Sequence, residues 1–178
     1  MNALAPLTHS TPATMQLLRK AAQSTNANIL PQIYNEDTNI VIWQRSTAEK
    51  LTKAVNALIA TSALKPIELA VSPNDAFDQL ITALKPEDNN RDEVNTLCED
   101  IALLVEMFCC LFDLKRAGLR LKILDKPMCP RFHVDKIPCR LVTTYQGVAT
   151  QWLNHSDVNR SKLGTGNLGK PDEESGLF

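Results

Sequence analysis

The sequence predicts an α+β protein in which a helix-rich N-terminal part precedes a run of short strands. Two patterns carry this prediction. Apolar residues recur every three or four positions across residues 91–113, whereas after Gly118 they alternate with charged residues, as in a strand with one solvated face. The chain has 178 residues, 44% of them hydrophobic, so it can bury one sizeable core and a single domain is expected.

We divide the chain into three parts by composition. Residues 1–12 are polar and interrupted by prolines, and we expect them to form a flexible arm. Residues 13–153 are expected to form one α+β domain, helix-rich over 13–117 and strand-forming over 118–153. Residues 154–178 are polar and contain several glycines, so we expect a polar loop or a truncated tail.

The first elements are short. Residues 14–22 are expected to form a short helix. Residues 39–44 are predicted to form a buried strand, because β-branched and aromatic side chains crowd a short run. A helix is then expected to follow a cap at Ser46 or Thr47, with Glu49 in its first turn.

Three further elements complete the helix-rich part. Residues 67–71 predict a second short strand. Pro73 and Pro86 are expected to start and to stop the next helix, since proline suits a first turn but not a helix interior. The long apolar stripe predicts a helix over 91–113, with a stop signal at Gly118.

The remainder of the domain is predicted to be β-structure. Alternating side chains predict strands at residues 119–123 and 140–145, and a turn at Gly147 leads into a further short strand at 150–153. Helices first and strands later is the order that defines the α+β prediction.

Charge and targeting signals narrow the function classes. Lys and Arg number 19 against 20 Asp and Glu. The chain therefore has no large net charge that would favour binding to nucleic acid or to a membrane surface. The N-terminus does not resemble a secretory signal, and no apolar run is long enough for a membrane helix. The five cysteines are odd in number and include an adjacent pair in an apolar helix pattern, which predicts reduced thiols and a cytoplasmic protein.

His133 and Asp135 are the candidate metal ligands. They are separated by one residue on a segment that we expect to be extended, and this spacing places an imidazole and a carboxylate on the same face. Such a pair with open coordination positions is typical of mononuclear non-haem Fe(II) sites, which normally use a second histidine. The alternative is a hydrogen-bonded structural histidine beside a solvated carboxylate.

Residues 118–153 resemble a known family of uncharacterised bacterial proteins, DUF1826. The family's core is an R-L strand, CPRFHVD, an R-L-x-x-T-Y strand and G-x-x-T-x-W-L. This chain has the corresponding residues at Arg120-Leu121, 129–135, 140–145 and 147–153.

A more remote resemblance is to Fe(II)/2-oxoglutarate oxygenases of the prolyl-hydroxylase type. It implies a helix-rich layer packed on the opening strands of a jelly roll, or double-stranded β-helix, and oxidative hydroxylation of a small-molecule or peptide substrate. It also implies Fe(II) held by His133 and Asp135, with His155 as the candidate third ligand, and 2-oxoglutarate as co-substrate. Arg140 and Tyr145 are the candidate co-substrate contacts.

The chain departs from the oxygenase pattern after its HxD motif. Those enzymes place a distal histidine and then a basic residue on later strands, whereas here the only later histidine is His155, in a polar stretch. The sequence reaches Phe178 with only the first strands of a jelly roll accounted for. We therefore expect a jelly roll that is incomplete at the C-terminus.

Other interpretations remain open for several residues. Cys129 and Cys139 flank the HxD motif, and zinc accepts cysteine, histidine and aspartate, so a zinc-binding or metal-homeostasis protein is the alternative. Arg140 could instead pair with Asp135, and Tyr145 could be a core residue. A structural or interaction module without metal is the third possibility.

Overall fold

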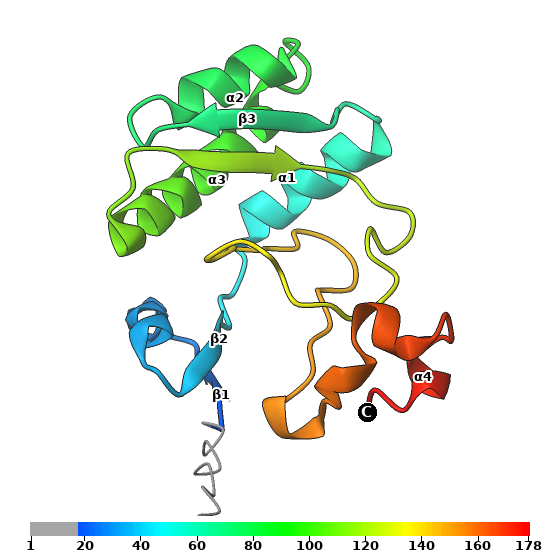
Figure 1. The fold of residues 1–178 in the computed structure, drawn as a ribbon. Helices are drawn as coiled ribbons and strands as arrows, with labels where there is room; N and C mark the ends of the chain where they lie inside the picture. Colours follow the sequence, from blue (N-terminus) through cyan, green and yellow to red (C-terminus); the bar gives the residue numbers. More distant parts are fainter. Residues whose placement is uncertain (1–17) are drawn as a thin grey trace, which may run out of the picture.

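The computed structural model describes residues 18–178 and contains helices and two small sheets (Figure 1). Strand β1 (Lys20–Ser24) pairs in parallel with β2 (Thr38–Trp43), and β3 (Ile67–Val71) pairs antiparallel with β4 (Ala117–Leu121). A mixed helix and sheet fold is therefore confirmed. The predicted arm, residues 1–12, lies outside the described residues.

The parallel sheet corrects one prediction. Residues 20–22, which were expected to end a short helix, lie in β1, and the rest of that predicted helix is only partly described. Strand β2 explains the difference, because Ala22 pairs with Val41 and an extended partner supplies hydrogen bonds that a short isolated helix lacks. The 3₁₀ helix η1 (Ala27–Tyr34) makes the crossover between the two strands.

Helix α1 (Glu49–Ala60) has the predicted position but not the predicted cap. Its N-cap is Ala48, which offers no side-chain acceptor, so neither Ser46 nor Thr47 caps the helix. Glu49 still lies in the first turn, where a carboxylate suits the positive end of the helix dipole, and it pairs with Lys53 at 2.6 Å.

Helices α2 (Ala76–Leu84) and α3 (Arg91–Phe112) follow the sequence pattern closely, and α3 packs against both α1 and α2. The end of α3 differs from prediction. The chain leaves the helix at Asp113, whose φ of 50° is left-handed, and Leu114 N–H binds the carbonyl of Cys109. Gly118 is thus not the helix stop.

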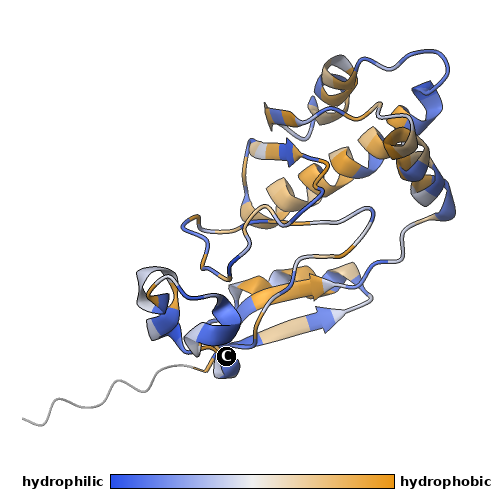
Figure 2. Cartoon of the chain, turned by 90° about the vertical axis from the view of Figure 1, so that its right-hand side faces the viewer, coloured by the Kyte–Doolittle hydropathy of each residue, from blue (hydrophilic) through white to orange (hydrophobic). Residues whose placement is uncertain are grey.

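The main core lies between β3, β4 and the three long helices. Helix α3 contributes the largest share of it, and Figure 2 shows hydrophobic residues running along this longest helix. The fully buried side chains with the largest volumes include Leu58, Leu80, Leu97, Val71 and Cys98.

Residues 122–153 form an irregular segment that runs between the helices and the C-terminal turns (Figure 1). The strands predicted at 140–145 and 150–153 are not formed. Side-chain alternation favours an extended chain, but a strand also needs a partner for its backbone groups, and the two sheets present have two strands each. The described residues contain no closed barrel.

The last 25 residues contain more secondary structure than the sequence suggests. Three 3₁₀ turns, η2 (His155–Asp157), η3 (Arg160–Lys162) and η4 (Gly164–Asn167), precede the short helix α4 (Asp172–Ser175). Leu177 is fully buried. Asp172 and Ser175 are also buried, whereas most other residues of this part are exposed.

Candidate functional site

The structure places His133 and Asp135 next to each other on the irregular segment. The distance from His133 Nε2 to Asp135 Oδ1 is 3.5 Å, which is within reach of an ion pair but longer than an ordinary hydrogen bond. About half of the His133 side chain and a third of the Asp135 side chain are exposed. The two predicted ligands thus share one side of the chain and are open to solvent.

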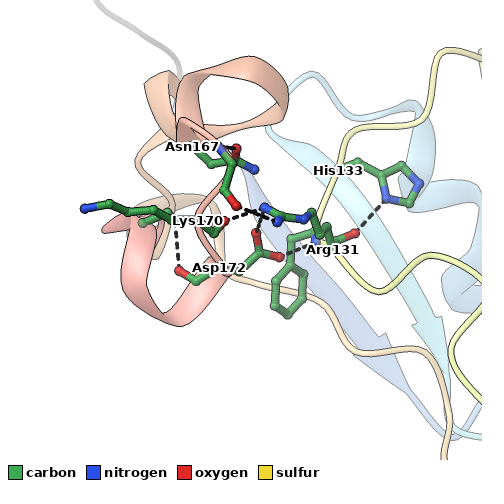
Figure 3. Close-up of polar contacts among 8 residues, drawn as sticks. Arg131, His133, Asn167, Lys170 and Asp172 are labelled. Atoms are coloured by element: carbon green, nitrogen blue, oxygen red, sulfur yellow. Dashed lines mark hydrogen bonds and ion pairs between the residues drawn. The ribbon is translucent and has the colours of Figure 1, made fainter.

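A backbone contact determines which nitrogen of His133 carries the proton. His133 Nδ1 lies 3.0 Å from the carbonyl oxygen of Arg131 (Figure 3). A carbonyl oxygen can only accept, so Nδ1 must be the donor in this contact. In a neutral ring with its proton on Nδ1, the free lone pair is on Nε2, the nitrogen that lies 3.5 Å from Asp135 Oδ1.

Arg140 lies on the other side of the same carboxylate. Its Nε is 3.3 Å from Asp135 Oδ2, so Asp135 has His133 at one oxygen and Arg140 at the other. Of the interpretations that the sequence allows for Arg140, pairing with Asp135 is the arrangement found. A positive charge therefore stands beside the candidate site.

His155 is located elsewhere, in η2. Its Nδ1 is 2.9 Å from Arg160 Nη2, and the two residues line a shallow surface depression with Leu18. Within residues 18–178, no group of three or more His, Cys, Asp or Glu side chains is arranged to hold a metal ion. The structure therefore brings together two of the three predicted ligands.

The two cysteines of the zinc alternative differ from one another. Cys129 is exposed, whereas Cys139 is partly buried, and burial raises the pKa of the Cys139 thiol. A raised pKa disfavours the thiolate that binds zinc. Neither cysteine joins a metal-binding group in the described part of the chain.

A second polar cluster lies close to this segment, and it includes Tyr145. The Tyr145 hydroxyl donates to Asp100 Oδ2 at 2.6 Å, and Arg45 binds both oxygens of the same carboxylate at 2.7 and 2.8 Å. Arg45 also lies over the rings of Tyr145 and Trp43. Tyr145 packs against the main core, so its side chain supports the fold at this point.

Asp100 remains ionised within this cluster. Burial alone would raise the pKa of its carboxyl, but the hydrogen bonds from Arg45 and Tyr145 outweigh burial and lower the pKa. The pKa of Tyr145 is raised, by burial first and then by its bond to the anionic Asp100. The cluster is thus a half-buried ion pair with a neutral phenol attached.

Sequence reasoning missed Arg45 and Asp100. Asp100 falls off the apolar stripe of α3, yet it is adjacent to Ile101 and three residues after Leu97, both of which are buried. That position at the edge of the stripe was the available signal. The partner could not be found in this way, because Arg45 is 55 residues away in sequence.

Comparison with known proteins identifies the family. The family described as "Protein of unknown function (DUF1826)" matches residues 24–176. The chain belongs to this family. No curated protein and no solved structure matches the chain.

The match confirms the family predicted from the CPRFHVD segment, whereas the likeness to oxygenases stays a prediction. In this DUF1826 chain, the Arg and Phe of CPRFHVD bind the C-terminal residues. Arg131 donates to the carbonyls of Gly169 and Lys170, and Phe132 N–H donates to Asp172 (Figure 3). These motif residues therefore have a structural role beside the candidate ligands.

Across residues 18–178 of this DUF1826 chain, every helix is too short or too polar to cross a bilayer.

Proposed function

We propose that this DUF1826 protein binds a divalent metal ion through His133 Nε2 and the carboxylate of Asp135. The observation that supports the proposal is the combination of two contacts. Nε2 lies 3.5 Å from Asp135 Oδ1, and Nδ1 is held by the Arg131 carbonyl. Metal-binding histidines commonly donate their other N–H to such an acceptor, which fixes the ring and its tautomer.

The separation of the two atoms suits a shared metal. Two ligands that are each about 2.1 Å from a metal are roughly 3.4 Å apart in tetrahedral geometry and roughly 3.0 Å apart at a right angle. The observed 3.5 Å is close to the first value. Side-chain exposure leaves room for water or an anionic molecule in the remaining coordination positions.

The more specific form of the proposal is an oxygenase-like activity with Fe(II) and 2-oxoglutarate. When bound, these would supply the oxidation of a C–H bond by O₂. Arg140 would hold the co-substrate's carboxylate, since its guanidinium already stands beside Asp135. Tyr145 would contact the co-substrate with its ring, because its hydroxyl already donates a hydrogen bond to Asp100.

A facial triad would require one more protein ligand. For His155 to serve, it would have to leave Arg160 and approach the pair. Zn(II) accepts the same two ligand types, so a metal-homeostasis function without oxidation is the alternative for this same site. Both versions depend on His133 and Asp135, which makes that pair the first target.

The test is the affinity of the full chain for Fe(II) and Zn(II), measured by anaerobic titration. His133→Ala and Asp135→Asn should each weaken binding at least tenfold, because the first removes a ligand and the second removes the negative charge of a ligand. Asp125→Asn is the matched control, since it removes one exposed carboxylate from the same segment outside the pair. Equal affinities for the parent and the ligand variants would rule out this site.

Two further measurements separate the versions of the proposal. For the oxygenase, 2-oxoglutarate should tighten Fe(II) binding, and Arg140→Ala should abolish that tightening while metal binding alone persists. For the metal-homeostasis alternative, Zn(II) should bind with no response to 2-oxoglutarate. A His155→Ala variant with unchanged affinity would remove His155 from the ligand set.

A further inference from the structure

The C-terminal residues are attached to the segment immediately before His133. Asp172 Oδ2 accepts a hydrogen bond from Phe132 N–H at 2.7 Å, and the Arg131 guanidinium donates to the carbonyls of Gly169 and Lys170. Figure 3 shows Arg131 reaching the C-terminal turns that carry Lys170 and Asp172. Residues that lie about 40 positions apart in sequence are thereby joined.

This attachment is packed as well as hydrogen-bonded. Asp172 is only 7% exposed, and its Oδ1 lies 3.9 Å from Arg131 Nη1. The ring of Phe132 meets that of Phe178 edge to face, with centroids 5.8 Å apart. Leu177 is fully buried, and its carbonyl accepts from Asn159 N–H at 2.7 Å. The C-terminus is therefore held at several points.

One peptide group links Asp172 to His133. The carbonyl of Arg131 and the N–H of Phe132 belong to the same planar peptide, so fixing the direction of one fixes the other. Asp172 binds the N–H at 2.7 Å, and His133 Nδ1 binds the carbonyl at 3.0 Å. An anionic acceptor on the N–H also polarises the peptide and strengthens its carbonyl as an acceptor.

We propose that Asp172 is a positioning residue for His133. Through the Arg131-Phe132 peptide, it holds the His133 ring in the tautomer with the proton on Nδ1. That tautomer leaves the Nε2 lone pair available beside Asp135. The consequence for metal binding rests on the proposed function above, whereas the tautomer is a property of the metal-free protein.

The direct test is ¹⁵N NMR of the His133 ring in the metal-free full chain at about pH 8. The parent should show the Nδ1–H tautomer, and Asp172→Ala should shift the ring toward Nε2–H. Asp172→Asn should restore much of the parental pattern, because its amide oxygen can still accept from Phe132 N–H. Glu173→Gln is the matched control on the same short helix, where the side chain is exposed.

If Asp172→Ala fails to fold, the proposal can still be tested, because the His133 tautomer in the spectrum of the parent can overturn it without any variant. An Nε2–H tautomer in the parent would overturn the proposal. So would an unchanged His133 tautomer in an Asp172→Ala variant whose far-UV circular dichroism matches the parent.

Metal titration distinguishes this proposal from the proposed function. With Zn(II) as probe, Asp172→Ala should lower the affinity about 10- to 100-fold, the usual effect of losing a residue that orients a metal ligand. If the parent binds no metal but its tautomer depends on Asp172, the positioning role stands and the metal function fails. If metal binds at His133, but neither the metal affinity nor the His133 tautomer changes in Asp172→Ala, the positioning role is wrong.

Discussion

The carboxylate of Asp100 binds the guanidinium of Arg45 with two hydrogen bonds, at 2.7 and 2.8 Å. Arg45 follows β2, Asp100 lies in the middle of α3, and Tyr145, from the irregular segment, donates to the same carboxylate at 2.6 Å. One side chain of the long helix thus connects the parallel sheet and the segment that carries the candidate metal ligands.

Replacing Asp100 by Ala should destabilise the protein by about 3 kcal/mol, the low end of the range for breaking one side of a buried ion pair. The low end applies because each side chain retains some exposure, 16% for Arg45 and 15% for Asp100. Urea unfolding measures this change. The control is Glu106→Ala, an exposed carboxylate on the same helix, which should cost about 0.5 kcal/mol or less. Equal losses in the two variants would mean that the Arg45 pair contributes nothing.

Asp100 should also contribute to acid sensitivity. Its folded-state pKa is lowered from the ordinary 3.8, so the unfolded chain takes up its proton first as the pH falls. Its stabilising contribution is present above pH 3.8 and is lost as the pH drops through the lower folded value. The free energy of unfolding of the parent should therefore fall more steeply below pH 4 than that of Asp100→Asn. Parallel pH curves for the two proteins would contradict the lowered pKa.

The long helix and β3 could be predicted closely because their signals are local. Residues 67–71 were predicted and found as a strand, and the predicted helix at 91–113 ends one residue earlier. Apolar spacing encodes such elements directly. The strands predicted at 140–145 and 150–153 failed for the complementary reason, since a strand depends on a partner that the pattern of one segment cannot reveal.

The same distinction applies to the candidate site. The proximity of His133 and Asp135 follows from a spacing of two and was predicted. The contacts of Arg131 and Phe132 with the C-terminal residues could not be predicted, because their partner Asp172 lies in a polar stretch that gives no sign of burial. Contacts between residues 40 or more positions apart depend on how the chain packs, and a single sequence does not report that packing.

The cysteines should divide by reactivity. Cys98 and Cys109 are buried in the α3 core, and burial raises the pKa of the Cys98 thiol to about 12. Because only the thiolate reacts, a disulfide reagent at pH 8 should leave both unmodified until the protein unfolds. Cys110 and Cys129 are exposed and should react in the folded state. Mass spectrometry after a short labelling pulse would identify the sites, and rapid labelling of Cys98 in the native protein would contradict the helix packing.

Leu177 should hold the C-terminal residues against the segment that contains His133. Leu177 is fully buried, whereas Leu168 is 82% exposed. Leu177→Ala should cost about 2 kcal/mol, the lower limit for a core leucine truncation, because Leu177 lies outside the main core and its surroundings can open without unfolding the rest. Leu168→Ala should change stability by about 0.5 kcal/mol or less.

Amide hydrogen exchange measures the local effect of Leu177 on the segment that contains His133. The Phe132 N–H, which binds Asp172, should exchange faster in Leu177→Ala and as in the parent in Leu168→Ala. Unchanged protection of that N–H in Leu177→Ala would show that Asp172 stays in place without the buried leucine.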